Sequence, residues 1–559
     1  MIKIIEEIAG ISLKKNYLLN KPLGVRGRSS DNSLAREKIN WDEHKEWFKA
    51  GLNNSNRLHF IVIDSVGFPF GQIRFDLFII ETIAKIDISI DKLARGFQLS
   101  TEVIKKGTFE EEFNLENCLL VIKSFLESVG GQKRKIIIGY DTRFLSKDIS
   151  EEISKYISYC GHKVILSNGP VPTPVVSFAV KNKSFDFGII ITASHNSSLW
   201  NGIKIKNSEG QSIDEKTVHN ISKKINSSTT KVGDYSNNDV EILREDLIDK
   251  YLNSISKFIN IAKIKNTELK VVVDCMFGTS VSLLSKILEG GKCNIIEINN
   301  NQDPSFPGIK QPEPISNNLK KLKLKITDLK ADIGFGFDAD SDRVGLVDNK
   351  GNYIDAPYTF CSIAEHILGN RNEIQSICTT VSMSSMIDKI ALYYKVDCVR
   401  TKIGFKYVAP EMTLNKSILG GEESGGYSYA PHLKERDGTI SALLLLEQLV
   451  DSGISSQELY IKQKKKYGNY FFKRSDFEID QNTRNKLIKF IKDFNKNNLF
   501  NLDVESINKK DGLKINLNDN SWLLLRLSGT EPVARIYCES KNEKSVKELV
   551  SNFIKYIKL

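Results

Sequence analysis

The sequence lacks several features that would assign it to a particular class of protein. None of its eight cysteines forms a Cys-x-x-Cys pair, which excludes the common zinc and dithiol redox motifs. No apolar run approaches the ~20 residues of a membrane-spanning helix. The first residues, MIKIIEEIAGISLKKN, carry two glutamates and do not have the layout of a signal peptide. Scattered thiols fit a reducing compartment, so we expect a cytoplasmic protein with no membrane partner.

Basic charge is present without the pattern of a nucleic-acid-binding module. The formal net charge is +10, but the lysines are spread along the whole chain and no aromatic-basic module is visible. We therefore expect no nucleic-acid partner. A positive potential also suits an anionic small molecule held in a cleft. The sequence does not indicate an oligomeric state.

The order of strand and helix patterns predicts several domains. At 559 residues the chain exceeds the size of one hydrophobic core. Strand-like runs such as RKIIIGYD and KVILSNG alternate with helix-like stretches such as SKDISEEISKYISYCG. This alternation is typical of parallel sheets covered by helices, and three such series follow one another. After about residue 466 alternating strands and two helices predict an α+β domain.

The first 106 residues have a different pattern and are predicted to form a separate module. GFPFGQIRFD and AKIDISID alternate polar and apolar residues as antiparallel strands do. LARGFQLSTEVIKKG then indicates a loop that enters a helix. We place the boundary of this module near residue 107.

The first candidate site is TASHNSSLWNGIKI, residues 192 to 205. An apolar strand leads to Ser194 in a turn rich in His, Asn and Gly. A serine at a strand end can act as a nucleophile or carry a phosphoryl group. Lys204 can neutralise phosphate charge or share a proton with a hydroxyl. Arg143 in GYDTRFLS can steady the serine loop through a carboxylate pair. For Ser194 alone, an ordinary polar turn is the simpler explanation.

The second candidate site is GFGFDADSDRVGLVD, residues 334 to 348. Asp338, Asp340 and Asp342 alternate after a buried-type strand, which puts three carboxylates on one side of an extended backbone. Like charges at this spacing repel unless a cation holds them, and oxygen ligands suit Mg²⁺ first. An EF-hand is the rival, but Arg343 stands where that loop needs glycine. A solvated acidic turn is the other alternative.

Two further loops can bind polar ligands. GGEESGGYSY, residues 420 to 429, combines glycines, two carboxylates and a serine, as recognition of sugar hydroxyls requires. Lys402 and Lys406 lie shortly before it and are either ligand-binding or solvated charges. RLSGTEPVARIY, residues 526 to 537, offers guanidinium groups, hydroxyls and loop amides that can cradle a phosphate. Taken alone, an acidic turn and a surface hairpin are the respective alternatives.

The four motifs in this order resemble the α-D-phosphohexomutase family, which includes phosphoglucomutase and phosphomannomutase. The resemblance covers about residues 107 to 559 through TASHN, NGIK, DADSDR, GEESGG and RLSGTEP. It implies three tandem α/β domains and a C-terminal α+β domain around a central cleft. The implied boundaries place the phosphoserine, metal-loop, sugar-loop and phosphate-loop domains at 107–243, 244–353, 354–465 and 466–559.

The resemblance also implies a role for each motif residue. Ser194 is the phosphorylated serine, and it binds Mg²⁺ together with the three aspartates of the second motif. Arg343 contacts the serine loop or the transferring phosphoryl group, and His195 and Lys204 lie beside the reacting oxygens. The substrate-binding residues of the third and fourth motifs are Lys406, Glu422, Ser424, Arg526, Ser528, Gly529, Thr530 and Arg535.

The chain departs from the family at its start, where an FGTxGxRG-like segment normally supplies an edge strand and an active-site arginine. Directly before TFEEEFNLENC no such segment is found, and Gly24-Val25-Arg26-Gly27 matches it about 80 residues too early. Residues 1–106 instead resemble the first half of a GNAT-type acetyltransferase through INWDEHKEWF, GQIRFD, IDISID and LARG. The later strands and helix of that family are absent, so we expect an inactive remnant.

The leading hypothesis is a phosphohexomutase that interconverts hexose 1-phosphate and hexose 6-phosphate, with hexose 1,6-bisphosphate as intermediate and activator. Phe405 and Gly426 stand where many mannose-type relatives have histidine, which favours glucose over mannose. The first alternative is a non-catalytic fusion that binds phosphosugars, because of the missing arginine segment. The second is a phosphatase that uses the aspartate loop as nucleophile.

Overall fold

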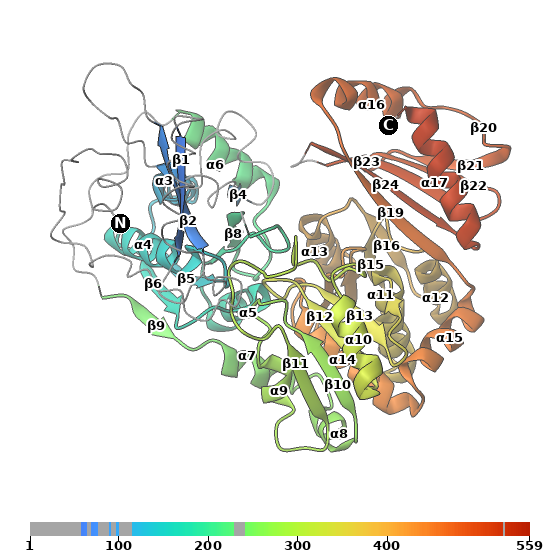
Figure 1. The fold of residues 1–559 in the computed structure, drawn as a ribbon, viewed down its shortest axis with the longest axis horizontal. Coiled ribbons are helices and arrows are strands. Elements are labelled where there is room, and N and C mark those ends of the chain that lie inside the picture. The colour runs from blue at the N-terminus through green and yellow to red at the C-terminus, as the bar shows by residue number, and fades with distance from the viewer. Residues whose placement is uncertain are drawn as a thin grey trace, which may run out of the picture. The chain divides into compact units, whose positions relative to one another are not determined.

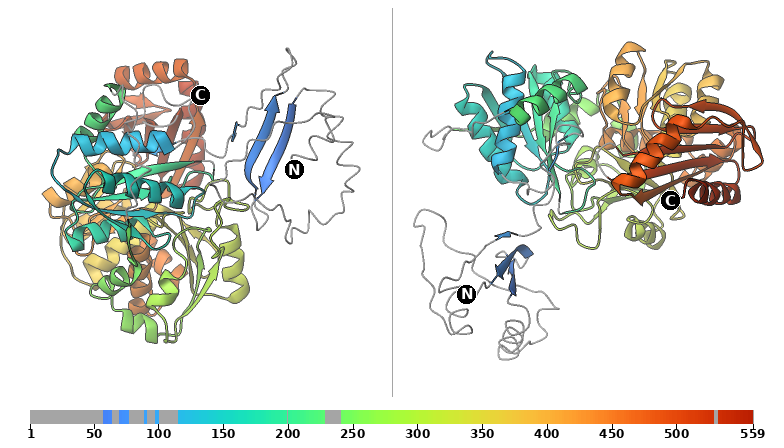
Figure 2. Two further views of the ribbon diagram at one scale, coloured as in Figure 1. Left: turned by 90° about the vertical axis from the view of Figure 1, so that its left-hand side faces the viewer. Right: turned by 90° about the horizontal axis from the view of Figure 1, so that it is seen from above.

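The computed structural model describes residues 57–63, 69–76, 89–90, 97–99, 115–198, 200–227, 241–528 and 532–558. The chain divides into two compact units, Met1–Gly96 and Phe97–Leu559. In the first unit, β1 (Arg57–Ile63), β2 (Pro69–Asp76) and β3 (Ser89–Ile90) form an antiparallel sheet, and Figure 2 shows β1 beside β2. The alternating segments are therefore strands as predicted. The acetyltransferase resemblance falls mostly outside the described residues and stays a prediction.

Three sheets of the second unit share one topology (Figure 1). In each, a central strand lies between two parallel neighbours, and one of these neighbours turns back as an antiparallel hairpin. The central strands are β5 (Lys135–Tyr140), β10 (Lys270–Asp274) and β15 (Ile377–Thr380). The hairpins pair β7 (Phe187–Ile191) with β8 (Asn201–Lys206), β12 (Ile333–Phe337) with β13 (Val344–Asp348), and β17 (Leu419–Gly421) with β18 (Tyr427–Tyr429). The three predicted α/β series are thus confirmed.

The remaining strands lie at the edges of these three sheets. The outer parallel neighbours are β6 (Lys163–Ser167), β11 (Asn294–Ile298) and β16 (Cys398–Thr401). The first sheet adds β9 (Leu243–Glu245) beside β6, and the second adds β14 (Tyr353–Ile354) beside β13. The first sheet also has the edge strand β4 (Phe97–Leu99), which pairs in parallel with β8. The sequence pattern placed these residues in a loop, because β4 is too short to show an alternating pattern.

Helices cover both faces of the first sheet. Helix α5 (Thr173–Lys183) lies against β5 and β7, where Gly188 leaves room for Val180 of the helix, since a Cβ at Gly188 would come within 2.6 Å of it. On the opposite face α4 (Ser146–Tyr159) contacts β5 and β6, and it packs on α3 (Leu115–Ser128), which in turn packs on α6 (Glu215–Ser227). The buried side chains of these helices fix the end of β7, from which the serine loop begins.

One large apolar core joins the first three sheets. It contains buried side chains of α5, of α11 (Ala356–Glu365) and of α14 (Gly438–Ser452), which is apolar over most of its surface. The short helices around these sheets are α7 (Ile248–Ile255), α8 (Ile261–Asn266), α9 (Leu283–Ile287), α10 (Lys320–Leu329), η1 (His366–Asn370), α12 (Met386–Tyr394), α13 (Phe405–Leu414) and α15 (Ser456–Tyr467). A shared core of this kind holds the three sheets in a defined arrangement.

The C-terminal part is the predicted α+β domain. Its antiparallel sheet has the order β19 (Phe471–Glu478), β24 (Val533–Ser540), β23 (Trp522–Leu527), β22 (Leu513–Leu517), β21 (Leu502–Asn508) and β20 (Asn498–Leu499). Helices α16 (Gln481–Asp493) and α17 (Glu543–Ile557) lie beside this sheet (Figure 1). They bury Leu487 and Phe553 in a core shared with the sheet. Trp522 and Tyr537 of the C-terminal sheet pack against Val381 of the third sheet.

The helices in the described part of the chain were also compared with the length and apolarity that a membrane span needs. None of them meets both requirements.

Candidate active site

All four sequence motifs occupy the turns of hairpins. The serine loop connects β7 to β8, the aspartate loop connects β12 to β13, and the GGEESGG loop connects β17 to β18. The RLSGTEP loop connects β23 to β24 in the C-terminal sheet, and its residues 529–531 lie outside the described residues. Because the three α/β sheets have the same topology, the first three loops are topologically equivalent.

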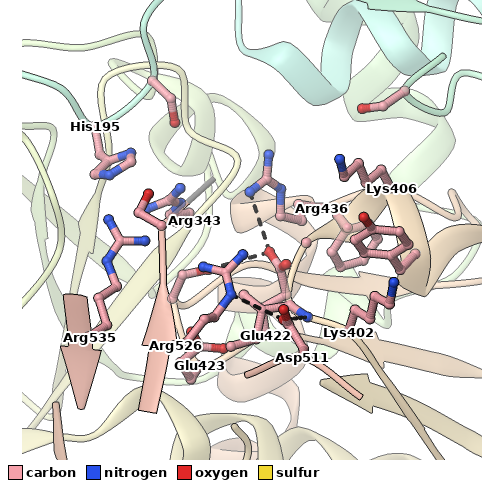
Figure 3. A pocket seen from close by; sticks show the side chains of 18 of the residues that line it. His195, Arg343, Lys402, Lys406, Glu422, Glu423, Arg436, Asp511, Arg526 and Arg535 are labelled. Carbon is pink, nitrogen blue, oxygen red and sulfur yellow. Dashed lines mark hydrogen bonds and ion pairs between the residues drawn. The ribbon is translucent and has the colours of Figure 1, made fainter. Parts of the chain in front are cut away.

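These loops line one cavity of about 440 Å³, which residues of all four sheets and their connections enclose. Figure 3 shows His195, Arg343 and Arg535 at one side of it and Lys402 and Lys406 at the other. Eight of the described lining residues are Lys or Arg and five are Asp or Glu, so the cavity favours an anionic ligand. The predicted residues that line the cavity are Ser194, His195, Lys204, Arg343, Lys406, Glu422, Ser424, Arg526, Ser528 and Arg535.

The serine loop is held by Arg143. Its guanidinium group pairs with Asp141 at 3.1 Å and donates to four loop carbonyls at 2.6 to 2.9 Å. The carbonyls belong to Ser194, Asn196, Ser197 and Trp200. All five N–H groups of the arginine are thereby used, which fixes the loop backbone. The predicted steadying role of Arg143 and its carboxylate pair are both present.

Ser194 stands in a left-handed backbone conformation, with φ of 51°, that turns the chain sharply after β7. Its amide donates to the Thr192 hydroxyl at 2.8 Å, which stabilises this turn. The Ser194 hydroxyl lines the cavity and donates to Oδ2 of Asp338 at 3.0 Å. Residues that are 144 positions apart in the sequence are thus brought into contact.

Asp338, Asp340 and Asp342 form a fully buried cluster whose ligand oxygens all lie within 4.8 Å of one another. Oδ1 of Asp340 and Oδ1 of Asp342 are buried and have no hydrogen-bond partner. Burial and the charges of the other two carboxylates raise the pKa of Asp338 well above its usual range. A divalent cation would satisfy the two oxygens and relieve this repulsion, so the cluster fits a hard metal ion.

Basic side chains surround the aspartate cluster. Lys204 Nζ lies 2.5 Å from Asp340 and 2.9 Å from Asp342, and Arg436 lies 2.8 Å from Asp342. Burial alone would raise the pKa of Asp342, but the nearby Arg436, Lys204 and Arg343 outweigh it and lower that pKa. Burial would likewise lower the pKa of Lys204, but Asp340 and Asp342 raise it instead. Lys204 is therefore a cation at neutral pH.

His195 is neutral at physiological pH. Burial, followed by the positive charges of Arg343, Arg474 and Arg535, holds its pKa well below the usual value. Its buried Nδ1 has no hydrogen-bond partner. A neutral imidazole can accept a proton or a hydrogen bond from a ligand in the cavity, but it does not add positive charge.

The GGEESGG loop presents two carboxylates with different partners. The Glu422 carboxylate lies 3.4 Å from the Arg436 guanidinium group, and the Ser424 hydroxyl donates to the Glu422 carboxylate at 3.5 Å. Glu423 accepts from the Ser382 hydroxyl at 2.5 Å. A Cβ at position 426 would lie 2.3 Å from the Arg436 side chain, so this position favours glycine. The missing side chain therefore makes room for the arginine that links this loop to the aspartate loop.

Two lysines that precede the GGEESGG loop in the sequence lie at the other side of the cavity (Figure 3). Lys402 and Lys406 both line it, and each stacks its ammonium group near the ring of Tyr407. Lys406 also forms an ion pair with Glu215 at 3.0 Å, and the Tyr407 hydroxyl donates to the same carboxylate. This contact joins the start of α6 to the start of α13 at the cavity.

Several residues of the cavity were not predicted from the sequence. They are Glu313, Arg436, Arg474 and Asp511, all of which line it. Asp511 holds Arg526 at 3.1 Å and the backbone N–H of Ile403 at 2.8 Å. None of the four belongs to a short motif. The only local signal is a charge beside a strand or a helix start, and many surface residues share it.

Comparison with known proteins identifies the family. Four models described as phosphoglucomutase/phosphomannomutase domains match the chain: domain I at residues 101–232, domain II at 249–351, domain III at 356–467 and the C-terminal domain at 484–555.

Individual relatives agree with these matches. A "Probable phosphoglucosamine mutase" of Methanosphaera stadtmanae is 33% identical over 455 residues, which is 81% of this chain and 97% of that protein. A phosphoglucomutase/phosphomannomutase of Thermococcus kodakarensis is 29% identical over 81% of this chain and 96% of that protein. The solved structure of a phosphoglucomutase/phosphomannomutase family protein from Burkholderia thailandensis matches the fold with a TM-score of 0.67 at 23% identity, covering 81% of this chain and 96% of that one. With a cavity that joins all four motif loops, the chain belongs to the phosphoglucomutase/phosphomannomutase family and is a mutase enzyme.

Proposed function

We propose that this enzyme interconverts hexose 1-phosphates and hexose 6-phosphates through a phosphorylated Ser194 and a hexose 1,6-bisphosphate intermediate. The observation that carries the proposal is the Ser194 hydroxyl, which lies 3.0 Å from Asp338 of the buried cluster and lines a basic cavity. Phosphoryl transfer needs in-line positioning and charge neutralisation more than covalent help from the protein. The basic lining and the buried carboxylate cluster support charge neutralisation at this site.

Mg²⁺ is the cation that we assign to Asp338, Asp340 and Asp342. When bound, it would neutralise charge on the phosphoryl oxygens. The residues of the chain contribute the rest of the electrostatics. Lys204 provides a positive charge beside the aspartate cluster, and neutral His195 can accept a hydrogen bond from a sugar hydroxyl.

The second half of the reaction requires the bisphosphate to turn round in the cavity. We propose that Arg526, Ser528, Gly529, Thr530 and Arg535 grip whichever phosphate is not reacting, while Glu422, Ser424 and Lys406 contact the sugar. The basic groups at both sides of the cavity support this assignment, because the intermediate carries two phosphates (Figure 3). A trace of bisphosphate would be needed to prime an unphosphorylated enzyme.

Three sugars are candidates for the substrate: glucose, glucosamine and mannose. The sequence favours glucose over mannose, whereas the names of several relatives specify glucosamine. Carboxylates at Glu422 and Glu423 accept hydrogen bonds from a hydroxyl or from an ammonium group equally well. We therefore propose glucose and glucosamine phosphates as the leading substrates, with mannose phosphates behind them.

The two alternatives gain no support. A phosphatase that uses an aspartate nucleophile must present it to the substrate, but the three aspartates are fully buried and are not among the described residues that line the cavity. A non-catalytic binding protein was suggested by the missing first segment. No observation on the described residues favours this reading, and the family match spans all four domains of the mutase fold.

We retain two expectations from the sequence. A cytoplasmic location is supported by the cysteines, because none of the eight, all of which the structure describes, forms a disulfide. The four domain boundaries near residues 107, 244, 354 and 466 also remain proposals.

The proposed function is tested by incubating the purified enzyme with each 1-phosphate, Mg²⁺ and a trace of glucose 1,6-bisphosphate. Phosphorus NMR would then show the 6-phosphate of at least one of the three sugars. Ser194→Ala should remove this conversion while the protein stays folded. Conversion that survives Ser194→Ala, or no conversion of any of the three sugars, would contradict the proposal.

A further inference from the structure

Glu313 connects two arginines that come from different parts of the chain. Its Oε1 lies 3.7 Å from Arg343, which follows the aspartate loop, and 3.3 Å from Arg474, which belongs to β19 of the C-terminal sheet. Both arginines line the cavity, and so does Glu313 itself, which is buried. One carboxylate oxygen of Glu313 therefore bridges the aspartate loop and the C-terminal domain.

The loop that carries Glu313 is built to hold it in place. Pro312 and Pro314 flank the glutamate and restrict its backbone. The Asn318 side-chain amide donates to the carbonyls of Gln311 and Glu313, each at 2.8 Å. A carboxylate on such a rigid turn can define the position of a flexible arginine.

Neither arginine depends on Glu313 for neutralisation. Arg474 makes a bidentate pair with Asp476 at 2.6 and 2.9 Å, and Arg343 lies within 3.8 Å of Asp338. Asp476 in turn lies 3.4 Å from Arg535. Charges of alternating sign thus run from the aspartate loop through Arg343, Glu313, Arg474 and Asp476 to Arg535. Glu313 instead contributes by positioning, because its charge holds Arg343 and Arg474 at one carboxylate oxygen and so links the two ends of this row.

We propose that Glu313 is a positioning residue that couples the docking of the C-terminal domain, through Arg474, to the orientation of Arg343 at the transferring phosphoryl group. This inference rests on the proposed mutase function. It assigns roles to Glu313 and Arg474, which no sequence motif marks. The docking of the C-terminal domain and the orientation of Arg343 then depend on each other. The guanidinium group of Arg343 is therefore correctly placed beside the aspartate loop only when the C-terminal domain is docked.

The coupling predicts a specific kinetic pattern for Glu313→Gln. This change keeps the shape of the side chain and removes its charge, so Arg343 loses its anchor while the cavity becomes more positive. We expect kcat to fall on the order of 10- to 100-fold, as for other partners that orient a group at a metal site. KM should stay the same or fall, because anion binding is not weakened. Damage to the fold would instead raise KM and lower the melting temperature.

A double-mutant cycle tests the coupling directly. Arg474→Gln alone should lower kcat, but it should have at most a small further effect in the Glu313→Gln background. Glu289→Gln, in an exposed turn that follows α9, is the control and should leave both constants unchanged. A kcat of Glu313→Gln within twofold of wild type, or losses that simply add in the double variant, would overturn the inference.

A binding experiment distinguishes a failure of this inference from a failure of the proposed function. Glucose 1,6-bisphosphate can be titrated calorimetrically into the Ser194→Ala protein with and without Glu313→Gln and Arg474→Gln. Non-additive changes in its affinity would support the coupling even if the wild-type enzyme converted no sugar phosphate. Additive changes would overturn the coupling even if the enzyme were an active mutase.

Discussion

Replacement of Arg143 by lysine tests how the serine loop is held. Arginine has five N–H groups, all in use here, whereas lysine has three, so at least two buried acceptors lose their partner. An unsatisfied buried acceptor costs about 1–3 kcal/mol, which gives about 4 kcal/mol for two. Such a cost shifts the equilibrium between the ordered and displaced loop by about 1,000-fold.

Because the Ser194 carbonyl is one of these acceptors, the nucleophile moves with the loop. We expect Arg143→Lys to lower kcat by about 100-fold or more, since small misplacements of reacting groups have effects of this size. Arg134→Lys, directly before β5, is the matched control, because Arg134 is half-buried and lies 3.5 Å from Asp186. That pair should contribute less than about 1 kcal/mol.

A coupled assay of 1-phosphate conversion and hydrogen exchange of residues 192–201 would measure these effects. Arg143→Lys should lose turnover together with amide protection in this segment, while Arg134→Lys keeps both. The reasoning would be refuted if Arg143→Lys retained turnover within threefold of wild type and normal protection.

Two further predictions concern the metal and stability. EDTA should abolish turnover and Mg²⁺ restore it, and Asp340→Asn should raise the Mg²⁺ concentration needed for half-maximal rate by at least about tenfold; an unaffected rate in EDTA would contradict the assigned cation. Despite its burial, Glu447 has a pKa lowered to about 2 by hydrogen bonds from His366 and the Asn260 amide and by the charge of Arg371. Its stabilisation should therefore be complete above pH 4.5 and disappear as the pH falls toward 2. After allowance for solvent screening it amounts to about 2 kcal/mol, so Glu447→Gln should lower the melting temperature at pH 7 and flatten its acid dependence.

Most of the predicted residues that line the cavity lie in short motifs in or beside hairpin turns. Ser194 follows the apolar strand β7, and the three aspartates follow β12. In both cases an apolar run that must be buried ends in polar residues that a strand interior would not tolerate. The pattern therefore predicts both the fold element and the position of the site.

Other features depend on tertiary contacts that no local pattern contains. Glu313 and Arg474 are 161 residues apart, and only the docking of β19 near the Pro-flanked turn brings them together. Arg436, in a loop that follows β18, likewise meets Asp342 only through tertiary contacts. The edge strand β4 has three residues, so its pairing with β8 decides its structure and its own sequence does not.

The central claim is that Ser194 carries the phosphoryl group during the reaction. It is tested most directly by peptide mapping of the purified enzyme after incubation with Mg²⁺ and glucose 1,6-bisphosphate. We predict one added phosphoryl group on the peptide that contains Ser194, and its loss when excess hexose 1-phosphate is supplied. An unmodified Ser194 peptide in an enzyme that still converts the sugar phosphate would contradict the account.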